Sequence, residues 1–415
     1  MLEALVIGAG QAGLAISHHL SSEGIEHLVV ERGRVGETWR TQRWDSFALN
    51  TPGWGSLLPG DVADTATADG FALRDAFVEY LDDYARRAAV PVRTGVRVAQ
   101  VKARRSGRGF DVETDGSGRL AARAVIVAAG FQRVPRLPAA AADLPPDVTQ
   151  LHSSAYRNPA ALPAGAVLVV GSAQSGVQVT EDLLDAGRTV YLATSRVARM
   201  RRRYRGRDIF AWLLDIGFFD QTVAMLPDPA LEFAPLPMIS GLGPLGHTVS
   251  LPWLAERGAT LLGHVDGVHG GRMLFRDDLG ANIGWADARS ADINRAIEAV
   301  IASRSMSAAP PEPDPVDEPH PNPARVHAPT ALDLADAGIA TVIWTTGVTA
   351  DLSFLPAETI GPAGHPLHTD GVAAIPGLYF LGLPWQRNRA SGIIAGTTTD
   401  AGILVGQIAA HLTGH

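Results

Sequence analysis

The chain has 415 residues, of which 46% are hydrophobic and 19% are charged; its formal net charge is −8 and it contains no cysteine. The length predicts two or three domains, and no apolar run approaches the roughly 20 residues of a membrane-spanning helix. The lack of cysteine excludes disulfides, thiolate metal sites, iron–sulfur clusters and dithiol redox chemistry. The acidic balance argues against a nucleic-acid partner, and the N-terminus shows no secretory signal, so we expect a cytoplasmic protein without a membrane span.

The N-terminal segment has the pattern of a strand–helix–strand unit. An apolar run at residues 4–7 enters the turn Gly8-Ala9-Gly10-Gln11-Ala12-Gly13, and a helical pattern then leads to a second apolar run, 27–30, which ends at Glu31. Short continuous apolar runs are typical of buried parallel strands. In such a unit the first glycine permits the tight turn, the second lets the backbone approach a pyrophosphate, and the third lets the helix pack against the strand.

The same design recurs in the middle of the chain. An apolar run at 166–170 enters Gly171-Ser172-Ala173-Gln174-Ser175-Gly176, and a second run at 189–193 follows the intervening helical pattern. Here Ala173 stands in place of the middle glycine. One such turn is weak evidence, but two with matching strands predict an α/β protein with two nested Rossmann-like dinucleotide-binding domains.

The residues that end the second strands predict two different nucleotides. Glu31 can accept hydrogen bonds from both ribose hydroxyls of an unphosphorylated adenosine, which favours FAD in the first unit. The second unit ends in Thr194-Ser195-Arg196, which offers hydroxyls and a guanidinium to a 2′-phosphate and so favours NADPH. The alternative for Arg196 is a solvated surface charge. The arginines that follow are expected to contact phosphate and solvent rather than a polyanionic partner: Arg199, Arg201, Arg202, Arg203, Arg205 and Arg207.

The remaining patterns predict how the two domains share the chain. Further strands are expected near 125–130, 340–344 and 378–381, and helices near 287–303 and 391–411. The proline-rich tract 308–315 is expected to be an extended linker. We therefore expect an FAD-binding domain of residues 1–155 and 325–415 around an NADPH-binding domain of residues 156–324, with an insertion at about 198–260.

Several motifs besides the two turns resemble those of one family. They are Gly36-Glu37-Thr38-Trp39-Arg40, Arg43-Trp44-Asp45-Ser46, 49–52, 151–156, Trp344-Thr345-Thr346-Gly347 and 377–382. Over nearly its full length the chain resembles the class B flavin-dependent monooxygenases, and most closely the bacterial flavoproteins associated with cation efflux or potassium transport. The resemblance implies FAD, NADPH and O2 as reactants, and a C4a-(hydro)peroxyflavin that oxidises a small organic substrate.

The turns and the resemblance together give the residues expected to hold the two cofactors. These are Gly8, Gly10, Gln11, Ala12, Gly13, Glu31, Arg32, Thr38, Trp39, Arg40, Asn50, Gly130, Gly171, Ser172, Ala173, Gln174, Ser175, Gly176, Ser195, Arg196, Thr346, Gly347, Gly382, Ser391, Gly392 and Ile393. The segment 390–394 is expected to begin the last helix with its N-terminus towards the reduced flavin. No metal-ligand pattern is present, so no metal is expected.

Candidate catalytic residues come from the same comparison. Gln174 stands where many flavin-containing monooxygenases have asparagine near the flavin, and Trp385 and Asn388 precede the last helix on the expected substrate side. Tyr156 stands where Baeyer–Villiger enzymes have tryptophan, so heteroatom (N or S) oxygenation is preferred over insertion into ketones. The family fingerprint is half present, because Pro146 and Val148 replace its Phe and Gly and only its His and Tyr match.

Two other readings remain open at this point. One is an NADPH-dependent flavin oxidoreductase that passes electrons to an acceptor without inserting oxygen, and the other is a flavin-dependent accessory or sensor protein of a transporter. The sequence leaves open the identity of the substrate and the formation of a homodimer.

Overall fold

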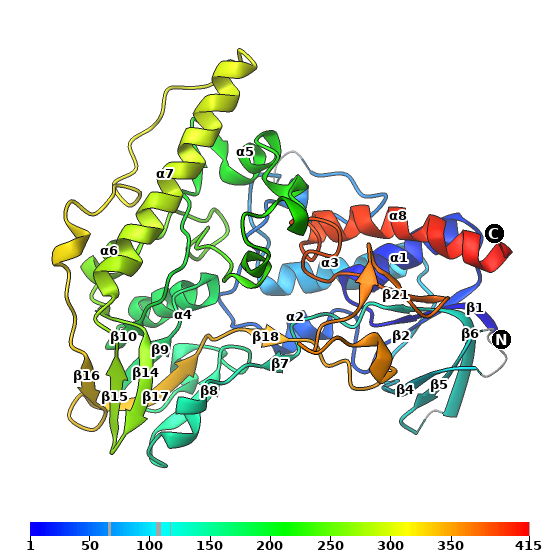
Figure 1. The fold of residues 1–415 in the computed structure, drawn as a ribbon, viewed down its shortest axis with the longest axis horizontal. Coiled ribbons are helices and arrows are strands. Elements are labelled where there is room, and N and C mark those ends of the chain that lie inside the picture. Colours follow the sequence, from blue (N-terminus) through cyan, green and yellow to red (C-terminus); the bar gives the residue numbers. More distant parts are fainter. Residues whose placement is uncertain (65–67, 105–108, 117, 415) are drawn as a thin grey trace.

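The computed structural model describes residues 1–64, 68–104, 109–116 and 118–414, and two sheets form the two halves of this part of the chain (Figure 1). The first sheet has nine strands. Their order is β19 (His368–Thr369), β20 (Val372–Ala373), β21 (Leu378–Phe380), β6 (Gly118–Val127), β1 (Leu2–Ile7), β2 (His27–Val30) and β3 (Val92–Arg93), with β4 (Val98–Ala103) and β5 (Phe110–Thr114) joined antiparallel through β6. Residues 4–7 of the central strand β1 are buried, as their continuous apolar run predicts.

Helices cover the first sheet and place its glycine-rich turn. The helix α1 (Gln11–Ser22) follows β1 directly and packs along α8 (Ile394–Thr413), as Figure 1 shows. Two more helices, α2 (Glu37–Thr41) and α3 (Arg74–Arg87), lie against each other beyond β2. Because α1 and α8 both begin at the carboxyl ends of strands, their N-termini point to the same edge of the sheet.

The second sheet has five parallel strands. Their order is β13 (Thr260–Leu262), β10 (Val190–Ala193), β9 (Ala166–Val170), β17 (Ile339–Trp344) and β8 (Thr149–His152). The helix α4 (Gln174–Asp185) connects β9 to β10 and α6 (Leu251–Glu256) precedes β13, whereas β14 (Val265–His269), β15 (Arg272–Phe275) and β16 (Ala331–Asp333) form a small antiparallel sheet. Both strand–helix–strand units expected from the sequence are therefore present, and the α/β fold is confirmed.

Strand pairing divides the chain at other positions than we expected. The sequence assigned residues 149–152 and 339–344 to the FAD-binding domain, whereas β8 and β17 pair within the second sheet. Between the sheets, β7 (Val134–Pro135) pairs antiparallel with β18 (Val348–Thr349) where the chain crosses twice. We therefore propose domain boundaries at this double crossing rather than near 155 and 325.

The insertion contains α5 (Ile209–Asp215), the short hairpin β11 (Arg203–Tyr204) and β12 (Arg207–Asp208), and irregular chain that reaches the last helix. Beyond it, α7 (Leu279–Ser303) projects from the second half of the molecule (Figure 1). It begins eight residues earlier than the sequence predicted, because Gly280 and Gly284 weaken the local helical signal while its first turns are buried against the protein. In the described part of the chain, no helix is both long and apolar enough to cross a membrane.

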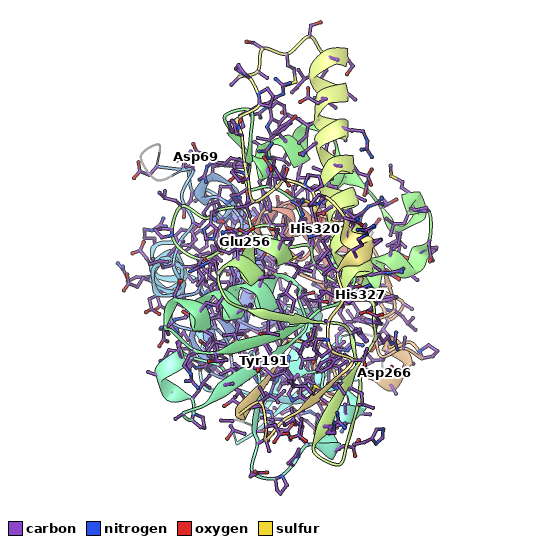
Figure 2. All side chains as sticks on the ribbon, turned by 90° about the vertical axis from the view of Figure 1, so that its left-hand side faces the viewer. Asp69, Tyr191, Glu256, Asp266, His320 and His327 are labelled. Carbon is purple, nitrogen blue, oxygen red and sulfur yellow. The ribbon has the colours of Figure 1, made fainter. Side chains whose placement is uncertain are left out.

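The proline-rich tract has no helix or strand, as expected, but it is not a free linker. Arg205 of the insertion donates to the Ala309 carbonyl at 2.9 Å, and the Thr248 hydroxyl donates to Asp314 at 2.6 Å. The chain after the tract returns alongside α7, where Figure 2 places His320, and the His320 amide donates to Asp287 of that helix at 2.9 Å. The tract is thus fastened to the insertion, and the chain that follows it is fastened to α7.

Candidate functional site

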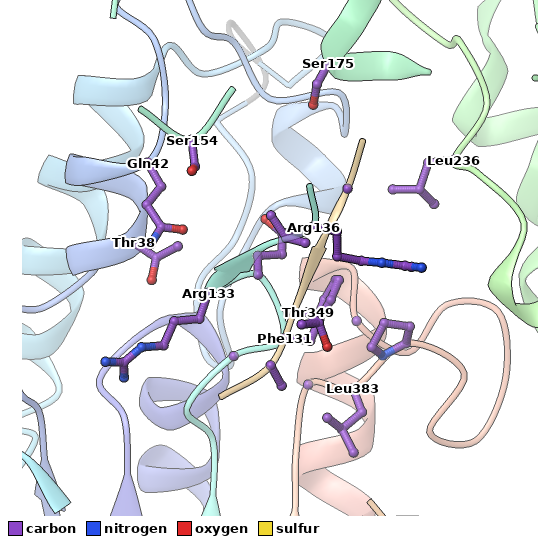
Figure 3. A pocket seen from close by; sticks show the side chains of 18 of the residues that line it. Thr38, Gln42, Phe131, Arg133, Arg136, Ser154, Ser175, Leu236, Thr349 and Leu383 are labelled. Atoms are coloured by element: carbon purple, nitrogen blue, oxygen red, sulfur yellow. The ribbon is translucent and has the colours of Figure 1, made fainter. Parts of the chain in front are cut away.

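One cavity of about 1490 Å³ runs between the two halves of the molecule and is lined by both glycine-rich turns. Thr38 of α2 and Gln42, which follows this helix, lie on one side of this space and Leu236 of the insertion on the other, and Arg133 of the crossing segment lies on the side of Thr38 (Figure 3). The segment before α8 lines the same space. Residues from six separate parts of the chain therefore converge on one site.

The first turn has the geometry of a pyrophosphate cradle. Gly8 has φ of +108°, and a β-carbon there would lie 2.4 Å from the Ala128 carbonyl oxygen, so only glycine fits. A β-carbon at Gly13 would lie 1.9 Å from the Gly8 carbonyl oxygen, which keeps α1 close to β1. At Gly10, by contrast, a β-carbon would meet nothing within 4 Å, and Gly10 lines the cavity. The free space at this helix N-terminus fits the phosphates of a bound dinucleotide.

The second turn repeats this geometry. Gly171 has φ of +106° and is crowded by Thr345, while a β-carbon at Gly176 would lie 1.9 Å from the Gly171 carbonyl oxygen. Ala173 caps α4 with φ −73° and ψ −178°, close to the values of −83° and −172° for Gly10 at the start of α1. The middle position therefore needs no positive φ, and alanine occupies it without strain. The alanine in place of glycine therefore reduces only the free space at the N-terminus of α4.

The two strand ends differ in charge and in what they present to the cavity. The carboxylate of Glu31 is buried and lines the cavity; its oxygens accept from the amides of Ala9 and Gly33, each at 2.9 Å. These bonds fix the carboxylate and leave a lone pair on each oxygen for a ligand hydroxyl. In the second unit Ser195 lines the cavity, whereas Arg196 is exposed and outside its wall. Within the described residues Arg196 has no carboxylate partner, so its guanidinium is available.

The arginines that follow have a structural role, which corrects the expectation of phosphate contacts. None of the six lines the cavity. Arg199 donates to Asp287 at 2.9 Å and pairs with Asp317, and Arg202 pairs with Asp208 at 2.6 Å, all buried. Their partners lie up to 118 residues away in the chain. Arg201 lies near Asp317, and Arg203 donates to the Leu245 carbonyl. Arg205 pairs with Glu298, and Arg207 pairs with Asp215.

The motif at residues 36–40 places Trp39 at the cavity and Arg40 away from it. The Trp39 indole donates to the Gln11 side-chain oxygen at 3.0 Å and stacks edge-on against Phe77, so this ring is held at the cavity wall. Arg40 lies outside the wall, pairing with Asp82 of α3 and donating to the Val35 carbonyl at 3.0 Å. Its function is to hold α2 onto α3.

The segment before α8 brings Trp385 to the cavity but not Asn388. The Asn388 side-chain oxygen accepts from the amides of Ala390 and Ser391 at 3.1 and 3.2 Å, so it stabilises the turn that leads to the helix. The Ser391 hydroxyl in turn donates to Asp400 at 2.6 Å. Trp385 lines the cavity with φ of +55°, an uncommon backbone conformation for a bulky residue.

The sequence-derived residues therefore fall into two groups. Those that line the cavity are Gly8, Gly10, Gln11, Ala12, Glu31, Arg32, Thr38, Trp39, Asn50, Gly130, Gly171, Ser172, Ala173, Gln174, Ser175, Ser195, Thr346, Gly347, Gly382, Trp385, Ser391, Gly392 and Ile393. Those outside its wall are Gly13, Arg40, Gly176, Arg196 and Asn388. Gly13 and Gly176 do not contact the cavity; each allows its helix to pack closely against the preceding strand.

Gln174 lines the cavity, but its side-chain amide is fully engaged with the insertion. It accepts from the amides of Ile239 and Ser240 at 2.7 and 3.3 Å and donates to the Ser240 carbonyl at 2.6 Å. One turn further along α4, Gln178 donates to the same carbonyl and to Asn50 at 3.3 and 3.2 Å. One face of α4 thus holds the cavity wall around Ile239.

Among the cavity residues that sequence reasoning did not name as site candidates are Arg43, Arg133 and Gln178. Burial lowers the pKa of Arg43 to about 10, and within the described residues it has no carboxylate partner. Arg133 lies 3.6 Å from Asp351. An unbalanced cation such as Arg43 on a cavity wall fits a phosphate of a bound nucleotide. The only sequence signal was their place in or beside the resemblance motifs.

His152 is a neutral structural residue at the crossing. Its ring nitrogens lie 2.9 Å from the Gly347 carbonyl and 2.9 Å from the Ser154 hydroxyl. Burial lowers its pKa below the ordinary value of a histidine, so the ring is uncharged at pH 7. It fastens the second sheet to the returning chain.

The chain is similar to proteins of known family. A family model described as pyridine nucleotide-disulphide oxidoreductase matches residues 5–208. An uncharacterised CzcO-like oxidoreductase of Geobacillus kaustophilus is 30% identical, over 99% of this chain and 99% of its own. The indole-3-pyruvate monooxygenase YUCCA1 of Oryza sativa subsp. japonica is 32% identical over 44% of this chain and 45% of its own. The flavin-containing monooxygenase from Stenotrophomonas maltophilia superposes with a TM-score of 0.65 at 20% identity, covering 99% and 98% of the two chains.

These likenesses and the two nucleotide cradles define a flavin-monooxygenase-type oxidoreductase fold. The chain belongs to the family of CzcO-like oxidoreductases. The expected fold class, the resemblance and the assignment as an enzyme are confirmed. Although the matching family model is named for disulphide chemistry, a dithiol step is impossible in a chain without cysteine.

Proposed function

We propose that the protein is an FAD-containing, NADPH- and O2-dependent monooxygenase that acts on a small organic substrate. The observation that supports this most strongly is the single cavity into which both nucleotide cradles open. A hydride donor and a flavin can meet only if their sites share one space. The partial likeness to a plant monooxygenase points to the same reaction type.

The chain's own residues would hold the two cofactors and keep the reacting end dry. Gly10 and Glu31 would hold FAD, and Ser175 and Ser195 would hold NADPH. Once bound, the flavin supplies the redox chemistry that takes hydride from NADPH and activates dioxygen. The α8 N-terminus, preceded by Gly392 and Ile393, would stabilise negative charge on the reduced ring by about 0.3–2 kcal/mol. Apolar side chains from the insertion would exclude water.

Heteroatom oxygenation is the preferred reaction class within this proposal. A soft nitrogen or sulfur nucleophile needs no protein base, and His152 is already occupied by hydrogen bonds. Tyr156 is buried and donates to Asp182 of α4 at 2.5 Å, so its hydroxyl has a structural partner. Burial raises the pKa of Tyr156 far above its ordinary value, which keeps it from acting as a base.

The proposal predicts a delayed reoxidation of the reduced enzyme. When NADPH-reduced protein is mixed with O2 in a stopped-flow spectrometer, the oxidised flavin spectrum should return slowly without substrate and rapidly with one. A screen of amines, sulfides and ketones with isotopically labelled dioxygen should then yield a product that carries one labelled oxygen. Immediate reoxidation with stoichiometric hydrogen peroxide, whatever compound is added, would show a non-oxygenating oxidoreductase instead.

Coenzyme preference gives a separate prediction. Replacing Arg196 with alanine should raise KM for NADPH about 10-fold, because one charge-assisted hydrogen bond to the 2′-phosphate is lost. KM for NADH should stay within about twofold, since NADH lacks that phosphate. Steady-state kinetics with both coenzymes provide the measurement. An equal change for the two would assign the 2′-phosphate to another residue.

A further inference from the structure

The cavity contains a cation at its apolar end. Arg389, in the turn before α8, lies between two aromatic rings: its guanidinium carbon is 4.3 Å from the ring centre of Phe218 and 4.5 Å from that of Trp385. Both rings line the cavity, together with Phe210, Leu213, Phe219 and Ile393. This end of the site is therefore an apolar compartment rich in aromatic rings, with one positive charge on its wall.

The charge of Arg389 has no counter-charge in the described part of the protein. Its Nε and Nη2 both donate to the side-chain oxygen of Gln221, at 3.1 and 2.9 Å, and within the described residues no carboxylate pairs with it. The neighbouring Arg387 shows the contrast, since it lies 2.8 Å from Asp400. In the described chain the buried Arg199, Arg201 and Arg202 likewise each lie against a carboxylate. Arg389 is thus an exception that faces a cavity.

The free edge of the guanidinium determines what would complete it. A guanidinium has five N–H donors, and Gln221 occupies two of them along one edge. The remaining donors, on Nη1 and Nη2, form a fork that matches the two oxygens of one carboxylate. Burial lowers the pKa of Arg389 from its ordinary value, yet an arginine remains charged at neutral pH. An unbalanced charge in an apolar compartment is costly unless an anion arrives there.

We propose that Arg389 is the carboxylate receptor of the substrate site, and that the substrate is a small organic acid with a flat apolar body. The acid group would pair with the free edge of Arg389 while the body packs among Phe218, Phe219 and Trp385. This inference rests on the proposed function, because it names the substrate class of the same cavity. Gln221 orients the receptor by holding the opposite edge of the guanidinium.

Binding of a matched pair of probes tests the receptor directly. Phenylacetate and phenylacetamide share one shape and differ in charge, and their dissociation constants for the oxidised holoenzyme can be followed by flavin absorbance and tryptophan fluorescence. In the unmodified protein phenylacetate should bind about 10-fold to 100-fold more tightly than the amide. Arg389→Gln should abolish this preference, and Arg389→Lys should restore part of it.

A second variant keeps the test valid if Arg389→Gln does not fold. Gln221→Glu places a carboxylate where the side-chain oxygen already accepts, so it balances the charge from within the protein. It should weaken phenylacetate about 10-fold or more and leave phenylacetamide unchanged. Arg207→Gln is the matched control, because Arg207 stacks 4.2 Å from the Trp212 ring centre but pairs with Asp215 outside the cavity. It should leave both probes unaffected.

Equal binding of the two probes to the unmodified protein would overturn the inference. So would a drop in the flavin midpoint potential of Arg389→Gln with an unchanged probe preference, since Arg389 would then serve the reduced flavin. The oxygenation experiment fails or succeeds independently: charge-selective binding without labelled product would retain the receptor and reject the monooxygenase. Delayed reoxidation without charge-selective binding would support the monooxygenase and reject the receptor.

Discussion

Glu31→Gln is expected to leave the purified protein largely without FAD. The carboxylate accepts the amides of Ala9 and Gly33 at 2.9 Å each, and both oxygens remain able to accept a ribose hydroxyl. An amide side chain replaces one acceptor with a donor, which then faces a backbone N–H and can no longer accept from the ribose. Loss of about 3 kcal/mol from charged hydrogen bonds corresponds to a roughly 100-fold weaker affinity for FAD.

The ratio of flavin to protein absorbance after purification measures this effect, and titration of the apoprotein with FAD gives the dissociation constant. Glu26→Gln is the matched control, since Glu26 precedes the same strand β2 at its exposed end. It should retain a full complement of flavin. A fully yellow Glu31→Gln protein would show that this carboxylate does not bind the ribose.

Gln174→Leu should loosen the cavity wall and lower catalytic efficiency. The leucine leaves the buried amides of Ile239 and Ser240 without their acceptor and removes a donor from the Ser240 carbonyl. The Ser240 carbonyl keeps its donor from Gln178, so two amides lose their partner. At about 1–3 kcal/mol for each, we expect the free energy of unfolding to fall by roughly 2–6 kcal/mol. The value of kcat/KM for the organic substrate should fall about 10-fold to 100-fold, while KM for NADPH changes less, because displacement of Ile239 affects the substrate side.

Chemical denaturation and steady-state kinetics with varied substrate and varied NADPH separate these effects. Gln407→Leu makes the same chemical change on the exposed side of α8 and should alter neither quantity. If Gln174 instead touches the reacting centre, the variant would be as stable as the parent and lose kcat alone. That result would remove its positioning role.

The sequence predicts this fold where the determining signals are local. The runs at 4–7 and 166–170 are apolar without interruption, and each is followed by a turn whose first and last glycines leave no room for a β-carbon, which would lie under 3 Å from backbone atoms. Both units therefore follow from signals in neighbouring residues. The partner of a strand is not a local property. The run at 339–344 looks like any buried strand, and only its pairing with β9 and β8 places it in the second sheet.

The site shows the same limit at the level of side chains. Glu31 and Ser195 could be placed because each ends a strand of a recognisable unit. Arg196 and the arginines after it look alike in sequence, yet only Arg196 lacks the acidic residue or carbonyl that holds each of the others. The role of Arg389 could not be found, because its partners Gln221 and Phe218 lie 168 and 171 residues earlier, in and directly after a short 3-10 helix of the insertion.

The helix α4 takes part in both the second nucleotide cradle and the cavity wall, which has a practical consequence for engineering. The first turn of α4 forms the second nucleotide cradle. Side chains of the same helix also hold the backbone around Ile239. A redesign of residues 171–176 that aims to change the choice of coenzyme would tilt or shift α4. Such a redesign should therefore alter substrate scope as well, and libraries that vary the two sites together should outperform those that vary them one after the other.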